Sequence, residues 1–435
     1  MRRLVHTLAR AAALLAALPF LSANALAGAV RPGPTRRARA AAGDADGAAD
    51  GALYVVVPYS PGEKSGGARA IQGLLTALEG GYRVETIPLY RIEPIGGRIR
   101  ALLSDWITHA LPMPLHCRPF VVSGESVRRR IADDRPLVIE FMSGAMFLLL
   151  GPRPANPIIL REHEPLCRRL WSERRTLRGA ERMLRPLQAA LAWLAMAAVY
   201  RKVDRIVALT PEDAAFVRRA FPFFARKVTD IPVSIDVPAA GASTAAEADG
   251  RELLMLGNFH HQPNVDGLVW WLREVAPRLG DGWTLHLCGI DRPLDGVDLP
   301  ASPVRVVRHG FVADVDAAFA HVPVAIAPVI SGGGVRMKNL ELAARGKAIV
   351  TTARGNEGIA FVPGVEAVVV DDARAMADAI RLLAADPAAA SAMGERARAR
   401  VRAGFGHGAV LARFREVLGA PAAPAERAIV EPAAA

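Results

Sequence analysis

The chain alternates short apolar runs with segments of helical periodicity, and this alternation occurs twice. Mainly apolar runs bounded by turn residues predict strands of a parallel sheet that is buried on both faces. In the first half, strands are expected at 52–58, 137–141, 158–160 and 205–209. In the second half, they are expected at 252–256, 284–288, 304–307, 324–328 and 348–351. Because helical segments separate the strands, the pattern predicts two α/β domains with parallel sheets.

The segments between these strands predict helices at several places. They are expected at 68–78, 165–202, from Val265 onward, near 315–321 and after the glycines at 332–334. Thr210 and Pro211, followed by Asp213, have the spacing of a helix start, with the threonine as cap and the proline at the first helical position. The apolar run at 187–200 is shorter than a membrane span requires, which favours a buried helix.

Low-complexity stretches divide the chain. We expect a signal-like or membrane-associating segment at 1–27, a linker at 28–50, an N-terminal domain at 51–237, a hinge at 238–250, a C-terminal domain at 251–405, a C-terminal helix at 406–420 and a flexible tail at 421–435. The first 27 residues combine basic residues, an apolar run at 11–21 and small residues typical of a cleavage site. The pattern alone leaves an anchor, a cleaved signal and a misassigned start open.

The composition excludes several classes of function. The chain has 435 residues and a net charge of +11, but only five of its 54 basic residues are lysines. Neither a zinc-finger pattern nor a long Lys/Arg block is present, so nucleic-acid binding is not expected. Cys117, Cys167 and Cys288 are widely spaced, which indicates neither a zinc site nor a disulfide framework.

The stretch SGGGVRMKNLELAARGK at 331–347 concentrates the candidate chemistry. Bare backbone amides at Gly332, Gly333 and Gly334, followed by a helix N-terminus, can hold a phosphate. Arg336 and Lys338 can contact a diphosphate from two sides. Glu341 lies three residues beyond Lys338 and so on nearly the same helix face, where a carboxylate can accept hydrogen bonds from ribose hydroxyls.

At these residues the chain resembles group 1 (family 4) glycosyltransferases, in the subgroup with a glycine-rich GGGxRxKxLE donor motif. The resemblance covers roughly 52–418 and is carried by MLGNFHHQPNVDGLVWWL, LHLCG, GFVADVDAAFA and the stretch from 324 to 359. It implies a GT-B fold, with two Rossmann-like parallel-sheet domains facing each other across a cleft. The N-terminal domain at 51–237 would then bind the acceptor and the C-terminal domain at 251–405 the nucleotide-sugar donor. It also implies a metal-independent, retaining hexosyltransferase that uses a nucleotide-diphosphate sugar as substrate and no cofactor.

The resemblance implies roles for further residues. His163 corresponds to a histidine near the reacting sugar and would be catalytic together with Arg336 and Lys338. The residues implied to bind the donor are Glu341, the three glycines, Gly257, Asn258 and Glu357. On the acceptor side the implied residues are Gly66 and Gly67. The expected partners are a nucleotide sugar and a carbohydrate or lipid-linked acceptor for cell-surface polysaccharide or glycolipid synthesis, and the expected location is cytoplasmic, at the inner face of the membrane.

Two departures from the family pattern leave alternatives open. The common pattern has a second glutamate eight positions before Glu341, where this chain has Gly333, and many members have a lysine in the first loop of the donor domain, where this chain has GNFHHQPN. A non-catalytic scaffold in a polysaccharide assembly complex and a nucleotide-sugar epimerase of the same fold are therefore the rival interpretations. Asp314 and Asp316 have a metal-binding spacing, but their place before a helix favours a cap. The arginine-rich face at 168–185 is compatible with a solvated helix or with contact to phospholipid.

Overall fold

The computed structural model describes residues 51–60, 66–91, 124–150, 153–174, 177–238, 251–290, 292–332 and 334–418. The chain divides into two compact units. The first comprises Met1–Glu63, Leu75–Ile231 and Leu411–Ala435, and the second comprises Lys64–Leu74 and Pro232–Val410. The expected segments 1–27 and 28–50, nearly all of the hinge, the tail, Cys117 and Gly333 lie outside the described residues.

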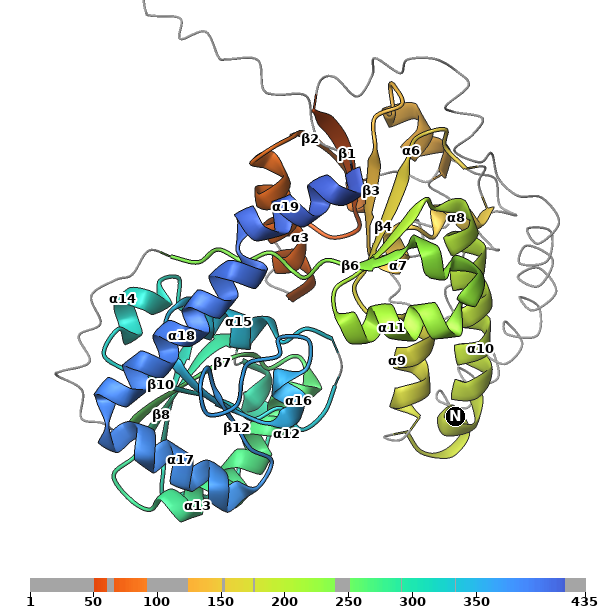
Figure 1. The fold of residues 1–435 in the computed structure, drawn as a ribbon. Helices are drawn as coiled ribbons and strands as arrows, with labels where there is room; N and C mark the ends of the chain where they lie inside the picture. The colour runs from red at the N-terminus through yellow and green to blue at the C-terminus, as the bar shows by residue number, and fades with distance from the viewer. Residues whose placement is uncertain are drawn as a thin grey trace, which may run out of the picture. The chain divides into compact units, whose positions relative to one another are not determined.

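The first unit contains a six-stranded parallel sheet in the order β2-β1-β3-β4-β5-β6 (Figure 1). The strands are β1 (Ala52–Val57), β2 (Arg83–Pro88), β3 (Leu137–Glu140), β4 (Ile158–Glu162), β5 (Arg205–Ala208) and β6 (Val228–Asp230). Its helical segments are α6 (Gly124–Arg130), α7 (Phe141–Gly144), α8 (Phe147–Leu150), α9 (Leu166–Glu173), α10 (Gly179–Lys202) and α11 (Pro211–Ala220), with short 3-10 turns at Leu89–Arg91 and Pro222–Lys227.

The helix expected at 165–202 is wrong as one element, because α9 and α10 are separate helices. Gly179 has a positive φ of 59°, a conformation that a continuing α-helix does not allow. By length and composition alone, α10 could cross a membrane, yet half of its most apolar 18-residue stretch is buried inside the protein. Leu191, Met196 and Tyr200 are fully buried, as predicted for a core helix. The threonine cap is also confirmed, since Thr210 accepts a hydrogen bond from Asp213 N.

The second unit contains another six-stranded parallel sheet, in the order β12-β11-β10-β7-β8-β9. The strands are β7 (Glu252–Asn258), β8 (Thr284–Ile290), β9 (Arg305–Gly310), β10 (Val324–Ala327), β11 (Ala348–Thr351) and β12 (Val368–Val369). The helical segments are α12 (Gln262–Trp270), a π-helical turn (Trp271–Val275), α13 (Ala276–Leu279), a 3-10 turn (Arg292–Gly296), α14 (Val315–Phe319), α15 (Met337–Ala344), α16 (Ala353–Asn356), α17 (Ala373–Ala385) and α18 (Pro387–Phe405).

Two helices are divided between the units. In α3 (Gly66–Glu79), residues up to Leu74 cluster with the second unit and the rest with the first. The last helix, α19 (His407–Leu418), lies within the C-terminal helix expected at 406–420, and its residues from Leu411 cluster with the first unit.

The order of strands in each sheet defines where a ligand can bind. In the second sheet, β7 and β10 are neighbours, and the chain leaves them in opposite directions across the sheet. In the first sheet, β1 and β3 have the same relation. Ligands of such sheets bind outside the carboxyl ends of the strands at this switch point. The segments that follow β7, β10, β1 and β3 are therefore the places to search for a site.

Candidate functional site

The segment after β10 contains the predicted glycine loop and begins α15. Gly332 and Gly334 have positive φ values of 87° and 79°, a region that other residues rarely adopt. A Cβ at Gly332 would also meet Pro263 Cγ at 3.0 Å. The conformation of this loop therefore requires glycine at both positions, whatever ligand it meets.

Arg336 precedes the first turn of α15, and its guanidinium is bound to backbone carbonyls. It donates to Gly332 O at 2.9 Å and to Arg354 O at 3.4 Å. Arg354 Nη1 donates to the same Gly332 carbonyl at 3.2 Å. Glu357 Oε2 lies 4.0 Å from Arg336 Nη2, and its side chain is 55% exposed. The loop carbonyl thus holds two guanidinium groups beside the helix N-terminus.

Lys338 links this helix to the segment that follows β7. Its Nζ donates to Asn264 Oδ1 at 3.0 Å. Burial, followed by the charge of Arg336, lowers the pKa of Lys338 to about 7. Desolvation and the same two cations also lower the pKa of His261. Arg336, Lys338 and His261 therefore lie close together, and positive charges on these side chains repel one another. An anionic ligand bound there would reduce this repulsion.

Two further contacts hold the segments after β7 and β10 against each other. Ser331 Oγ donates to Asp266 Oδ2 at 3.1 Å. Gly267 in α12 lies so close to β10's end that a Cβ there would stand 1.9 Å from Pro328 O. At the switch point of the second sheet, the segments after β7 and β10 therefore pack tightly against each other. Arg336 and Lys338 lie beside this contact.

Glu341 lies one turn along α15 from the two cations. Its side chain is 14% exposed and pairs with Arg69 Nη1 of α3, which belongs to the same unit. The carboxylate is thus at the predicted position on the helix, but in this structure it already has a cationic partner. A ribose bound there would have to compete with Arg69 or use the second carboxylate oxygen.

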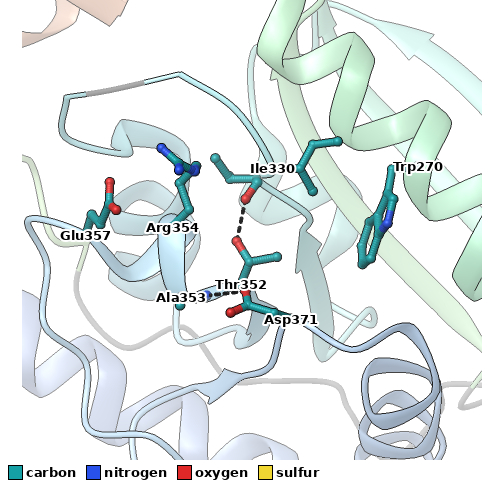
Figure 2. A pocket seen from close by; sticks show the side chains of 8 residues that line it. Trp270, Ile330, Thr352, Ala353, Arg354, Glu357 and Asp371 are labelled. Carbon is teal, nitrogen blue, oxygen red and sulfur yellow. Dashed lines mark hydrogen bonds between the residues drawn. The ribbon is translucent and has the colours of Figure 1, made fainter. Parts of the chain in front are cut away.

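A cavity of about 380 Å³ borders Arg354 and Glu357 (Figure 2). Its lining comes from the segments after β10, β11 and β12 and from Trp270 at the end of α12. Thr352 Oγ1 donates to Val329 O at 2.5 Å, and Asp371 accepts from Ala353 N at 2.9 Å. One aromatic ring, one guanidinium and two carboxylates therefore surround a space of the size of a small polar ligand.

The first unit places a second group of polar residues at the carboxyl ends of β3 and β4. His163 Nε2 lies 2.6 Å from Glu140 Oε2, and Arg161 Nη1 donates to both oxygens of Glu140 at 3.3 Å. The side chains of Glu140 and Arg161 are fully buried, and that of His163 is 10% exposed. The structure thus brings the predicted His163 together with two charged residues that the sequence analysis did not single out.

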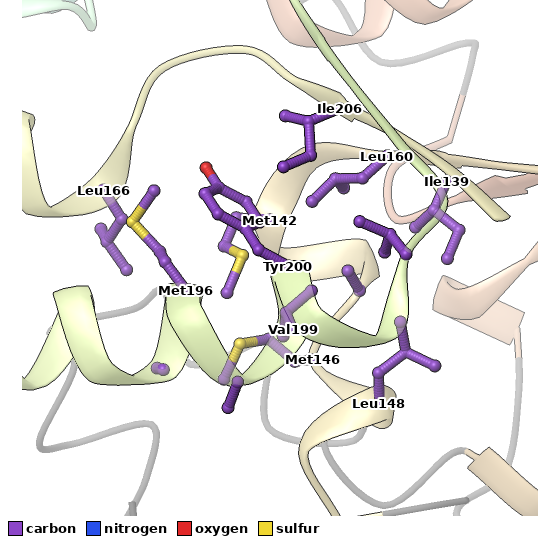
Figure 3. Packing of buried hydrophobic residues seen from close by; sticks show 14 of the residues in the cluster. Ile139, Met142, Met146, Leu148, Leu160, Leu166, Met196, Val199, Tyr200 and Ile206 are labelled. Carbon is purple, nitrogen blue, oxygen red and sulfur yellow. The ribbon is translucent and has the colours of Figure 1, made fainter. Parts of the chain in front are cut away.

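The core of the first unit anchors the strands that carry this group. Ile139 and Leu160 precede Glu140 and Arg161, and both are fully buried. They pack with Met142, Tyr200 and neighbouring residues in one apolar cluster (Figure 3). Because the core holds the ends of these strands in place, the backbone positions of Glu140, Arg161 and His163 are well defined.

Of the remaining predicted residues, Asn258 adjoins the Lys338 site, because its backbone carbonyl accepts a hydrogen bond from Asn264 Nδ2 at 2.8 Å. Gly66 begins α3, and a Cβ there would meet nothing within 4 Å, so packing does not demand glycine. Gly257 packs against the ring of Phe259, which lies 3.0 Å from a Cβ built there. Asn258 Oδ1 accepts from His260 N at 3.0 Å and so shapes the turn after β7. Gly67 lies beside Gly66 in the first turn of α3.

Asp314 is a helix cap, as the sequence analysis favoured. Its side chain accepts a hydrogen bond from Ala317 N at 2.9 Å, and Asp316 pairs with Arg345 at 3.1 Å. Among the described residues, no group of three or more His, Cys, Asp or Glu side chains could hold a metal ion. Cys167 and Cys288 are buried free thiols.

Glu140, Asn264 and Arg354 were missed by the sequence analysis. A weak signal existed for Glu140, because an ionisable residue that ends an otherwise apolar strand is costly to bury without a partner. Asn264 and Arg354 gave no such signal. Their importance depends on which strands are neighbours in the folded sheet.

Comparison with known proteins identifies the fold. Residues 250–386 match the family model described as glycosyl transferases group 1. Sucrose-phosphate synthase from Thermosynechococcus elongatus is similar over 84% of this chain and 98% of its own, at 17% identity and a TM-score of 0.60. Anabaena HepE in complex with UDP-glucose is similar over 84% of this chain and 99% of its own, at 14% identity and a TM-score of 0.56.

A third solved structure is an α-glucosyltransferase in complex with UDP and a 13-mer DNA. It is 12% identical, with a TM-score of 0.54, over 84% of this chain and 99% of its own. Among curated protein sequences, none matches this chain. The two parallel six-stranded sheets are thus the GT-B fold, as predicted from the sequence.

Proposed function

We propose that the protein is a glycosyltransferase that moves a sugar from a nucleotide-diphosphate sugar to a hydroxyl acceptor. The observation that carries the proposal is the pair of cations, Arg336 and Lys338, at the N-terminus of α15 beside the switch point of the second sheet. A helix N-terminus and two cations favour a diphosphate over other ligands of similar size. The match of residues 250–386 to the group 1 glycosyltransferase model supports the same chemistry.

The cations act on the leaving group. As the bond between the sugar and the diphosphate breaks, negative charge grows on the leaving oxygen. Arg336 is already held by Gly332 O, and Lys338 by Asn264, so neither has to be ordered at that moment. Such preorganised donors stabilise the transition state more than the bound substrate. Glu341 holds the ribose once its contact with Arg69 is exchanged, and Glu357 accepts hydrogen bonds from sugar hydroxyls.

The proposal extends to the stereochemistry and the metal requirement. The enzyme belongs to the subgroup with the GGGxRxKxLE motif, transfers a hexose with retention of configuration and needs no metal, because two side-chain cations meet the diphosphate. The aspartates that could have suggested a metal site have structural partners in Ala317 N and Arg345.

The acceptor is a carbohydrate or a lipid-linked sugar of a cell-surface polymer, met at the cytoplasmic face of a membrane. Exposed apolar side chains and arginines on α9 and α10 support this. Trp171 is 53% exposed and Met183 81%, and Arg174 stacks over the Trp171 ring at 4.6 Å. Aromatic and cationic side chains together are typical of surfaces that contact anionic lipid headgroups.

The test is a panel of UDP- and GDP-sugars with purified protein, scored by release of the free nucleoside diphosphate and by product analysis. We expect one donor to be turned over and Arg336→Ala to lose most of that activity. Arg374→Ala is the matched control, since it removes the same charge from a side chain that is 85% exposed on α17. Lack of nucleotide binding by the folded wild-type protein would refute the site, and an epimerised donor would assign it to an epimerase.

A further inference from the structure

The group around His163 lies at the switch point of the first sheet. Glu140 ends β3, and Glu140 and Arg161 are directly opposite each other in the register of β3 and β4. His163 follows two residues after Arg161 and therefore points to the same face of the sheet. Tyr59 follows β1, the other strand of this switch point, and its ring meets that of Phe141 edge-on at 5.1 Å. Five residues from three strand ends thus converge where a ligand of this sheet would bind.

The backbone and the rings hold His163 in one orientation. Phe141 has a φ of 64°, in the left-handed region that a phenylalanine rarely adopts. Such a conformation is strained, and strained residues of this kind cluster at functional sites. It places the Phe141 ring flat on the imidazole, with centroids 3.5 Å apart and planes 16° apart. The imidazole is therefore fixed by stacking on one side and by the Glu140 carboxylate at its Nε2.

The charges decide which nitrogen carries the proton. Although burial opposes it, the charge of Arg161 and the hydrogen bonds from Arg161 and His163 hold the pKa of Glu140 below its ordinary value, so this carboxylate is ionised and can only accept hydrogen bonds. Burial lowers the pKa of His163 despite the nearby carboxylate, so the ring is neutral with a single N–H. That proton must lie on Nε2, at 2.6 Å from Glu140, which leaves a lone pair on Nδ1. Within the described part of the chain, Nδ1 has no hydrogen-bond partner.

We propose that Glu140 is a positioning residue for sugar transfer, which fixes His163 in the Nε2–H tautomer so that Nδ1 accepts a hydrogen bond from a substrate hydroxyl. The proposal rests on the glycosyltransferase function given above. An ion pair between Glu140 and Arg161 alone would explain neither the short contact to His163 nor the strained backbone of Phe141. A base held by a hydrogen-bonded carboxylate is the arrangement by which enzymes select a histidine tautomer.

Two substitutions of Glu140 separate hydrogen-bond position from charge. Glu140 Oε2 accepts hydrogen bonds from both His163 and Arg161. In Glu140→Gln we therefore expect the side-chain amide oxygen to take the position of Oε2, where it can accept from both. Glu140→Gln should therefore keep the Nε2–H tautomer although it loses the charge. Glu140→Asp keeps a negative charge beside Arg161, but its shorter side chain withdraws the carboxylate from His163. In Glu140→Asp the His163 ring should therefore no longer be held in one tautomer.

The tautomer is read from the ¹⁵N resonances of histidine-labelled protein, with His163 assigned by its loss in His163→Ala. We expect an unprotonated Nδ1 in wild type and in Glu140→Gln, and exchange between tautomers in Glu140→Asp. In Glu140→Asp we expect kcat to fall about 10²-fold, at the lower end for a positioned proton acceptor, with the KM for donor unchanged. Glu140→Gln should lose less kcat than Glu140→Asp, because it keeps an acceptor at His163 Nε2.

The possible results separate this inference from the proposed function. A protonated Nδ1 in wild type overturns the positioning role, whatever the activity. So does the reverse pattern, in which Glu140→Asp retains turnover and tautomer while Glu140→Gln loses both, because charge pairing alone would then be the role of Glu140. Calorimetry with the nucleotide sugar tests the donor site by itself. Failure there refutes the proposed function while the histidine resonances still report the tautomer.

Discussion

Donor binding should weaken as the pH rises from 6.5 to 8.5, because Lys338 must be protonated to meet the diphosphate. Burial and Arg336 lower its pKa to about 7 in the free protein, and a bound diphosphate brings negative charge that favours the protonated form. Only the protonated fraction is competent to bind, which is about three quarters at pH 6.5 and about 3% at pH 8.5. The apparent Kd should therefore rise about 25-fold, or about 1.9 kcal/mol.

Isothermal calorimetry with an intact nucleotide sugar measures this, because its diphosphate does not titrate in this range. Binding at pH 7 should also take up about half a proton, seen as a dependence of the measured heat on the ionisation enthalpy of the buffer. Lys338→Arg is the matched control, since a guanidinium stays charged throughout and should give a flat profile. His261 has a lowered pKa and stays mainly neutral over this interval.

Two results would refute the reasoning. A wild-type Kd that does not change between pH 6.5 and 8.5 would mean that Lys338 does not contact the diphosphate. An equal slope in Lys338→Arg would assign the titration to another group.

The remaining predictions concern the nucleotide site, the metal requirement and the packing of α18. Glu341→Ala should weaken donor affinity about tenfold to hundredfold, since a hydrogen bond to a charged group contributes roughly 1.5–3 kcal/mol, and unchanged affinity in calorimetry would remove Glu341 from the site. Arg336→Ala should lower kcat about 10²–10³-fold in steady-state assays, and a folded variant with wild-type turnover would contradict the role of this cation. Activity should survive EDTA, and loss that Mg²⁺ or Mn²⁺ restores would disprove the metal-free mechanism. Gly394→Ala should destabilise the protein by about 1–3 kcal/mol in denaturant unfolding, because its Cβ would stand 1.9 Å from Gly346 O. Gly404→Ala on the same helix has no atom within 4 Å and should be stabilising by up to about 1 kcal/mol, so equal effects of the two would count against the packing argument.

The sequence predicted most of the strands because the strands of a parallel sheet are buried on both faces and read as apolar runs. β10 and β11 are buried at every position and were found within a residue. β2, β6 and β12 were missed. β2 is an edge strand with a mainly exposed pattern, β6 is an edge strand of three residues, and β12 has only two residues. Their strand conformation comes from pairing with a neighbour, which no local pattern records.

By itself, the sequence determined the glycine loop and the cations of the candidate nucleotide site. The order of strand, glycines, cations and helix lies within one short stretch, so local spacing fixes what the helix N-terminus presents. Only the tertiary structure decided which residues form hydrogen bonds with the candidate functional side chains. Lys338 meets Asn264 across 74 positions and His163 meets Glu140 across 23, because the sheet order sets β10 beside β7 and β4 beside β3. Burial in the folded chain then lowers the pKa of Lys338, and we propose that Glu140 sets the tautomer of His163; no local sequence pattern records either effect.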